Sequence, residues 1–90
     1  MEKITSLTFT NTFSKEHLVT VTLYKLEIGY AVLSEFGCKL DGQTRLTYYD
    51  AEEYFNHVIQ ETRKAYHSME MPFNTTETKW KITTKLQKLS

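Results

Sequence analysis

The sequence predicts an α+β fold, an antiparallel sheet of four to five strands with one amphipathic helix packed on one of its faces. Apolar residues recur at helical spacing in a single stretch, at about residues 50–69. Shorter stretches on both sides of it alternate apolar and polar residues, as half-buried strands do. Turn-forming residues separate these stretches, so neighbouring strands are expected to form an antiparallel meander.

The first two strands are predicted where threonines alternate with apolar residues. They cover about residues 7–13 and 19–23, and each has one apolar face and one threonine face. The segment 11–17 is polar enough to form the connecting loop, and the alternative is that its first residues extend the first strand to Phe13. A break at residues 27–29 then precedes a third strand over residues 30–36. A turn over residues 39–42 leads to a fourth strand over residues 43–49.

The helix is predicted together with both of its ends. Asp50 is expected to cap the first turn while Glu53 reaches back to it, and Pro72 prevents the helix from continuing past Met71. We expect this helix to cover the sheet and to be structural first. Its apolar face consists of Ala51, Tyr54, Phe55, Val58, Ile59, Thr62, Ala65, Tyr66 and Met69.

A fifth strand is predicted over residues 78–86, where alternation returns, and its lysines suit a sheet edge. The ninety residues contain no repeat or linker, so a single domain over residues 1–90 is expected. The predicted core beneath the helix consists of Leu7, Phe9, Val19, Val21, Leu23, Val32, Leu46 and Tyr48, with Trp80 and Ile82 closing one side.

Composition narrows the classes of function. Eleven basic and eleven acidic residues balance, which argues against a protein that coats nucleic acid by bulk charge. Cys38 is the only cysteine, so no intrachain disulfide can form and a reducing compartment is expected. The first residues lack the pattern of a secretion signal, and no stretch is long enough to span a membrane. We therefore expect a cytoplasmic protein without membrane contact.

No residues carry a specific signature of catalysis. Glu53, His57 and Glu61 recur every four residues on the outward helix face, a spacing that could serve metal binding or proton transfer. A solvated face is the simpler interpretation, because no further strong ligand lies nearby. Cys38 has no nearby base to activate its thiol, and the three scattered glycines form no phosphate-binding loop. We expect no catalytic residue, metal or cofactor, and no enzymatic activity.

The carboxyl-terminal segment is one candidate binding surface. Trp80 lies between Lys79 and Lys81, with Lys85 beyond them, so lysines could contact phosphates beside a stacking aromatic ring. The structural alternative is a core tryptophan opposite a solvated row of lysines.

The outer face of the sheet is a second candidate. Leu18, Tyr24 and Leu26 would lie opposite the core face of the second strand. An exposed apolar patch there would suit a protein partner or a homodimer. A second small core under a loop is the alternative.

Four short motifs follow one another in the middle of the chain. They are a strand over residues 30–33, Phe36-Gly37-Cys38, Gly42-Gln43-Thr44 and Arg63-Lys64-Ala65-Tyr66. From about Leu18 to His67 the chain resembles a WGR domain, a small module of DNA-dependent poly(ADP-ribose) polymerases and many bacterial proteins. The motifs resemble its strand, its Trp-Gly-Arg signature, its Gly-Gln turn and its closing Lys-Gly-Tyr.

The resemblance implies a sheet-and-helix fold and contact with nucleic acid. Phe36 replaces the signature tryptophan and could still stack on a base, whereas Cys38 replaces the signature arginine. The residues that the resemblance implies for binding are Phe36, Arg45, Arg63 and Lys64.

Two hypotheses for function follow. The leading one is a non-enzymatic binding module that contacts nucleic acid. Its binding residues would be Phe36, Arg45 and the lysine row Lys79, Lys81 and Lys85. The alternative is a small protein of the kind carried by phages and plasmids, which binds another protein and inhibits or adapts it through the outer sheet face.

Overall fold

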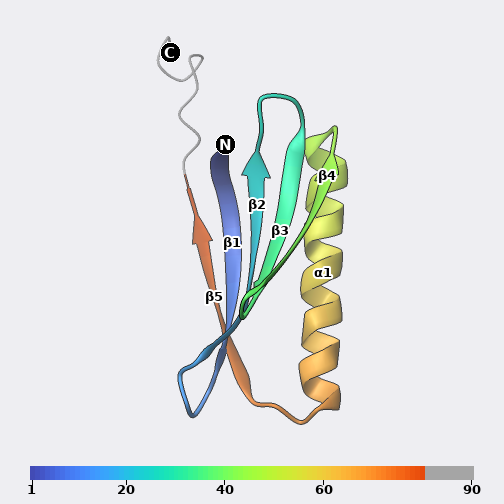
Figure 1. Cartoon of the computed structure of the whole chain (residues 1–90). Coiled ribbons are helices and arrows are strands. Elements are labelled where there is room, and N and C mark those ends of the chain that lie inside the picture. Colours follow the sequence, from blue (N-terminus) through green and yellow to red (C-terminus); the bar gives the residue numbers. More distant parts are fainter. Residues whose placement is uncertain (81–90) are drawn as a thin grey trace.

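The computed structural model describes residues 1–80 and places them in a five-stranded sheet with a helix along one face (Figure 1). The elements are β1 (Glu2–Asn11), β2 (His17–Lys25), β3 (Tyr30–Phe36), β4 (Lys39–Arg45), α1 (Tyr48–Ser68) and β5 (Phe73–Lys79). The strand order is β4-β3-β2-β1-β5, and every pair is antiparallel. The first four strands form the predicted meander, β5 returns to the edge beside β1, and the predicted α+β class is confirmed.

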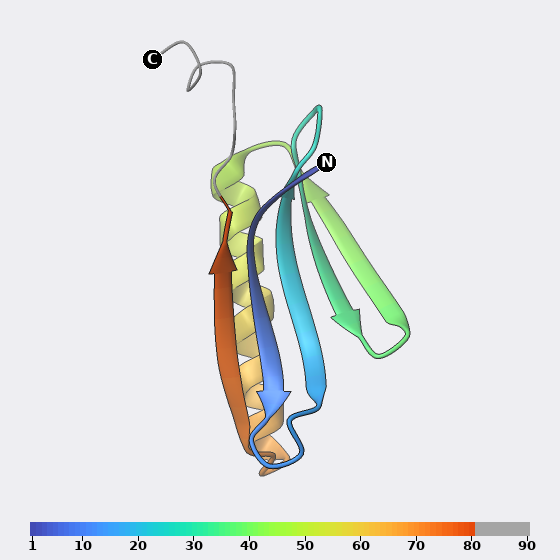
Figure 2. The same ribbon diagram turned by 90° about the vertical axis from the view of Figure 1, so that its left-hand side faces the viewer.

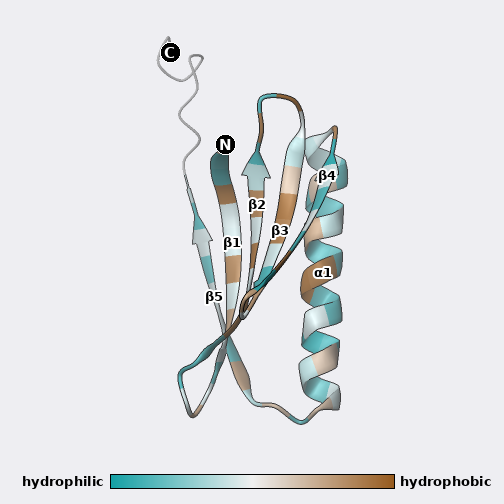
Figure 3. Cartoon of the chain, in the orientation of Figure 1, coloured by the Kyte–Doolittle hydropathy of each residue, from teal (hydrophilic) through white to brown (hydrophobic). Residues whose placement is uncertain are grey.

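The core forms where α1 packs against the apolar face of β1, β2 and β3. Alternation along each strand sends every second side chain to this face, and the pairing register brings these side chains together. Apolar residues accordingly gather in the three inner strands, whereas the edge strands β4 and β5 are largely hydrophilic (Figure 3). The cross-strand pairs on the buried face are Leu7–Val21, Phe9–Val19 and Leu23–Val32.

The opposite face of the sheet carries the threonines. Thr8 and Thr20 face each other across β1 and β2, with their hydroxyl oxygens 3.1 Å apart. In Figure 2 the helix lies behind the sheet, and no element within residues 1–80 lies in front of it. The predicted two-faced character of the first two strands is confirmed, although β1 begins earlier than predicted and β2 extends further at both ends.

The apolar face predicted for the helix divides into two stripes. The first stripe packs against the sheet and consists of Ala51, Phe55, Ile59 and Tyr66. The second stripe lies beside it, half-buried or exposed, and consists of Tyr54, Val58, Thr62, Ala65 and Met69. Figure 2 shows the reason, because the far end of the β3–β4 hairpin turns away from α1. The sheet therefore does not reach around the second stripe.

The helix begins two residues earlier than predicted, and Thr47 rather than Asp50 is its N-cap. The Thr47 side chain accepts a hydrogen bond from the backbone N–H of Asp50 at 3.2 Å. The predicted capping box of Asp50 and Glu53 is therefore wrong. Asp50 instead lies in the first turn, where its negative charge interacts favourably with the helix dipole. At the other end α1 stops at Ser68, one residue before the predicted end.

The β3–β4 hairpin turns earlier than predicted. The pairing of the two strands leaves Gly37 and Cys38 as a two-residue turn, and Gly37 has a φ of 59°, which glycine adopts more readily than other residues. The fourth strand is therefore β4 rather than residues 43–49. The segment predicted as a turn, residues 39–42, lies inside this strand.

This shift removes two residues from the predicted core. Leu46 lies in the link between β4 and α1 and is 80% exposed, and Tyr48 is exposed in the first turn of α1. Both predictions are wrong because they required the fourth strand to continue beneath the helix. Trp80, predicted to close one side of the core, is 39% exposed and does not join the core cluster, so this prediction is also wrong. Ile82 lies outside the described residues.

The fifth strand begins earlier than the predicted range, residues 78–86. Phe73 opens β5 opposite Asn11 and packs with its ring centroid 5.3 Å from that of Phe9. This aromatic contact explains the early start, because it ties the chain to the core soon after the helix ends. Residues 81–86 of the predicted strand lie outside the described residues.

We expect Thr47→Ala to lower the free energy of unfolding by about 1 kcal/mol, because the Asp50 N–H would lose its hydrogen-bond acceptor. Asp50→Ala is the matched control, and should cost about 0.3–1 kcal/mol, the usual strength of an exposed charge at a helix N-terminus. Urea denaturation followed by circular dichroism measures both. If Asp50→Ala lowered the free energy of unfolding more than Thr47→Ala, Asp50 rather than Thr47 would be the N-cap residue.

Tyr66 is a buried residue with an unsatisfied polar atom. It is 4% exposed, and its ring meets that of Phe9 edge-on with centroids 5.8 Å apart. Its hydroxyl has no hydrogen-bond partner within residues 1–80. Burial raises the pKa of this phenol, because the charged form would be poorly solvated.

We expect Tyr66→Phe to leave the free energy of unfolding unchanged or to raise it by up to about 1 kcal/mol, because the substitution removes an unpartnered buried hydroxyl. Tyr66→Ala should lower it by about 3–5 kcal/mol, the usual cost of deleting a core ring. Urea titration of the three proteins separates the two effects. A clear loss of stability in Tyr66→Phe would show that the hydroxyl is partnered in the folded chain.

Candidate functional site

A groove lies between α1 and the far end of the β3–β4 hairpin. Its volume is about 440 Å³, and most of its lining is apolar. We call it the helix–hairpin groove. Val19, Phe36 and Tyr66 line it together with the whole second stripe, and His57 and Glu61 are the remaining lining residues.

Phe36 reaches the groove because of its position in β3. Val32 belongs to the buried core, and every second residue of a strand points to the same face, so Phe36 also points to the helix side. Phe36 is the last residue of β3, where the hairpin has turned away from α1 (Figure 2). Its ring is therefore left 55% exposed at the groove.

The groove continues into a polar hollow toward the start of α1. This hollow has a volume of about 330 Å³ and shares Tyr54 and His57 with the groove. The guanidinium of Arg45 lies over the Tyr54 ring, 4.6 Å from its centroid, and Asp50 and Glu53 complete the lining. A continuous surface thus follows one side of the helix, polar at its start and apolar toward its end.

Carboxylates outnumber cations along this surface. Asp50, Glu53 and Glu61 line it, against Arg45 as the one Lys or Arg in the lining, which is three negative charges against one positive. Lys64 lies 3.7 Å from the Glu61 carboxylate, but both side chains are well exposed, so the pair contributes little. The surface therefore favours a cationic partner over an anionic one.

The residues predicted for nucleic-acid contact are only partly brought together. Phe36 lines the groove and Arg45 lines the adjoining hollow. Arg63 lies 5.8 Å over the ring of Phe9, a residue of β1, and so contacts the core instead.

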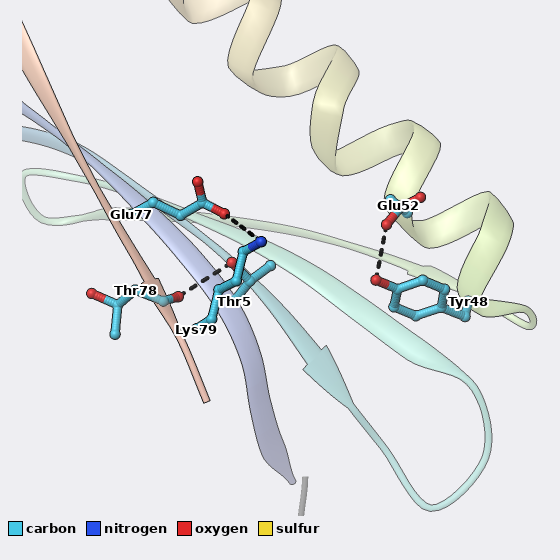
Figure 4. A network of polar contacts seen from close by, with 6 residues as sticks. All are labelled: Thr5, Tyr48, Glu52, Glu77, Thr78 and Lys79. Carbon is cyan, nitrogen blue, oxygen red and sulfur yellow. Dashed lines mark hydrogen bonds and ion pairs between the residues drawn. The ribbon is translucent and has the colours of Figure 1, made fainter. Parts of the chain in front are cut away.

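The lysine row does not join these residues. Lys79 pairs with Glu77 at 3.5 Å on β5, the edge strand opposite β4 (Figure 4). Lys81 and Lys85 lie outside the described residues. Trp80 carries Lys3 above its ring at 5.3 Å, and is neither fully buried in the core nor fully open to a base.

The apolar patch predicted on the outer sheet face is not exposed. Tyr24 is buried, with Lys3 and Ala31 as its cross-strand neighbours. Leu18 is half-buried and packs against the core, and Leu26 is also half-buried. Of the two alternatives left open for these residues, an exposed patch and a second small core, the exposed patch is not formed.

The remaining candidates are Cys38, a group of metal ligands and a membrane-spanning helix. Cys38 lies exposed in the hairpin turn. No group of three or more histidine, cysteine, aspartate or glutamate side chains in residues 1–80 is arranged to hold a metal ion. In the same part of the chain, α1 is too polar to cross a bilayer.

Sequence reasoning found the groove residues of the helix but assigned them to the core. A helix resting on a sheet buries a stripe about 100° wide, and nine apolar positions are more than the observed stripe of four uses. This excess was the available signal. The contribution of Phe36 to the same surface depends on how far the hairpin turns away, which no periodicity in the sequence specifies.

Comparisons of the chain with protein-family models, with curated proteins and with solved structures found no match. The WGR resemblance therefore stays a prediction. Its signature segment falls on the β3–β4 turn, whereas its Gly42-Gln43-Thr44 segment lies within β4 rather than at a turn.

A second cleft, of about 260 Å³, lies between the start of α1, the first half of β1 and the end of β5. At its border the Tyr48 hydroxyl donates a hydrogen bond to Glu52 Oε2 at 2.9 Å (Figure 4). This hydrogen bond, together with burial and the charge of Glu52, raises the pKa of Tyr48 above its ordinary value of 10.0. The pKa of Tyr48 therefore reports whether its hydrogen bond to Glu52 is formed.

We expect Glu52→Gln to lower the pKa of Tyr48, because the carboxylate that favours the protonated phenol is removed. A raised folded-state pKa gives stability that is present below about pH 10 and lost as the pH rises through the folded value. An NMR pH titration of the Tyr48 ring measures the shift. Glu53→Gln is the control and should leave it unchanged. An unaltered Tyr48 titration in Glu52→Gln would mean that the hydrogen bond is not formed.

Proposed function

We propose that the protein is a non-enzymatic binding module whose partner is another protein, bound in the helix–hairpin groove. The observation that carries the proposal is the unfilled apolar surface formed by the second stripe and Phe36. Contiguous exposed apolar surface in a soluble domain commonly marks an interaction site. The absence of any catalytic signature in the sequence supports the non-enzymatic part of the proposal.

Burial of this surface by a partner would contribute favourably to the free energy of binding. Phe36 is 55% exposed and Met69 is 59% exposed, and both line the groove. Complete burial of such a side chain contributes about 1.5–3 kcal/mol, so covering the exposed half of each contributes about 1 kcal/mol. Large apolar side chains around a shared groove are the usual anchors of a protein interface.

The charges favour a protein over nucleic acid at this surface. Phosphates would meet Glu53 and Glu61 along the helix, and these carboxylates would repel them. Lys79, predicted to contact phosphate, lies on the opposite edge strand and is paired with Glu77. Nucleic-acid binding, the leading hypothesis from the sequence, is therefore treated as the competing outcome of the test.

The test is an affinity pull-down with the tagged full chain from source-cell lysate, with and without nuclease, compared across three proteins. The groove variant is Phe36→Asp, which places a charge in the apolar lining. The control variant is Ile28→Asp, which changes an apolar side chain that is 82% exposed in the β2–β3 loop. Circular dichroism verifies that both variants are folded.

We expect one protein to be recovered by the original chain and by Ile28→Asp, regardless of nuclease. Its recovery by Phe36→Asp should fall about tenfold, the change that a loss of 1.4 kcal/mol produces. Equal recovery by Phe36→Asp would place the interface elsewhere. Recovery that depends on intact nucleic acid would support the competing hypothesis.

A further inference from the structure

The second stripe has the spacing of a helix-packing seam. Val58, Thr62, Ala65 and Met69 follow one another at intervals of four, three and four residues, as the inner positions of paired helices do. Thr62 and Ala65 are small, so a second helix axis could approach to the usual distance of about 8–10 Å. Within residues 1–80 no other element covers this seam.

One side of the seam is bordered by its own fold and the other by carboxylates. Tyr66, on the sheet side, is buried against the core. On the other side, Glu61 lines the groove beside the seam, and Glu53 lines the polar hollow that continues the groove toward the start of α1. A helix that lies on the seam and extends over the hollow would therefore meet two negative charges.

We infer that the groove takes a basic amphipathic helix of a partner protein. Its apolar side chains would pack on the seam and against Phe36, and its lysines or arginines would lie beside Glu53 and Glu61. This inference rests on the proposed function and adds the chemistry and conformation of the partner. The seam from Val58 to Met69 rises about 17 Å, so the bound helix needs about three turns.

The walls of the groove favour a helix over an extended peptide. An extended peptide gains its affinity by adding to a free strand edge, where backbone N–H and C=O groups are unpaired. The backbone groups of α1 are occupied by its own helical hydrogen bonds, and no residue of the edge strand β4 lines the groove. A partner in this groove therefore gains affinity through side-chain packing and charge, which an amphipathic helix supplies.

The test uses three synthetic peptides of about 15 residues, long enough to form a helix when bound. The basic peptide has leucines on one helical face and lysines and alanines on the other. The acidic peptide has glutamate in place of every lysine. The scrambled peptide has the composition of the basic one, with leucines spread around the helix.

Binding of each labelled peptide to the full chain is followed by fluorescence anisotropy, and helix formation by circular dichroism. We expect the basic peptide to gain helix on binding, and to bind at least tenfold more tightly than the other two. Ala65→Arg, which blocks the seam, should abolish binding, and Ile28→Asp should not change it. The double variant Glu53→Lys, Glu61→Lys should exchange the preference in favour of the acidic peptide.

Each contrary outcome identifies which step fails. Equal binding of the acidic peptide would overturn the charge assignment, and equal binding of the scrambled peptide would overturn the helical seam. No peptide binding, with protein capture still lost in Phe36→Asp, would overturn this inference alone. No peptide binding with capture unaffected by Phe36→Asp would overturn the proposed function as well. A dimer that Ala65→Arg dissociates would make the occupant a second copy of this chain, and would also overturn the inference.

Discussion

The structure depends on one contact, the burial of the first helix stripe against the apolar face of the three inner strands. An antiparallel sheet with one apolar face is unstable in water until that face is covered, and α1 covers it within residues 1–80. The largest fully buried side chains, Phe9, Val21, Leu23 and Val32, all lie on the sheet side of this contact. Because the contact orients the helix, it also determines which other helix residues remain uncovered.

The twist of the sheet explains why an apolar groove lies beside this contact. Adjacent strands rotate by about 20–25° relative to one another, so a straight helix cannot follow all five strands. The helix lies along the inner strands, and the β3–β4 hairpin diverges from it (Figure 2). The divergence leaves Phe36 and the second stripe facing a shared space. The groove therefore follows from covering a twisted sheet with one helix.

The sequence predicted the elements well where the local pattern has one interpretation. The third strand agrees with β3 residue for residue, because Gly29 and Gly37 end the alternation on both sides with positive φ values. The predicted range of the fourth strand was wrong because Gly42 was interpreted as a turn residue. A Cβ at Gly42 would lie 2.5 Å from Cδ2 of Leu33, so the glycine serves the close approach of a neighbouring side chain within the strand.

For the candidate site, too, the sequence identified residues from local patterns but did not place them relative to one another. The WGR resemblance identified Phe36, and helical spacing identified the Glu53, His57 and Glu61 series, but their relative positions depend on contacts distant in sequence. The contact of Arg45 with Tyr54 could not be predicted from the sequence, because it requires β4 to end beside the start of the helix. The cationic residues predicted to act together were separated by the same topology, which places β4 and β5 on opposite edges.

Folding alone does not account for the two exposed apolar side chains of the second stripe, Ala65 and Met69. The first stripe already satisfies the contact with the sheet, and polar side chains at Ala65 and Met69 would leave that contact intact. An exposed apolar side chain gains nothing from folding, since the hydrophobic contribution comes only from surface removed from water. Tyr54 and Val58 are half-buried and pack against the core, whereas Ala65 and Met69 are exposed and gain that contribution only when another surface covers them. The proposed association would cover these two side chains, and the seam spacing and the carboxylates restrict which surface fits.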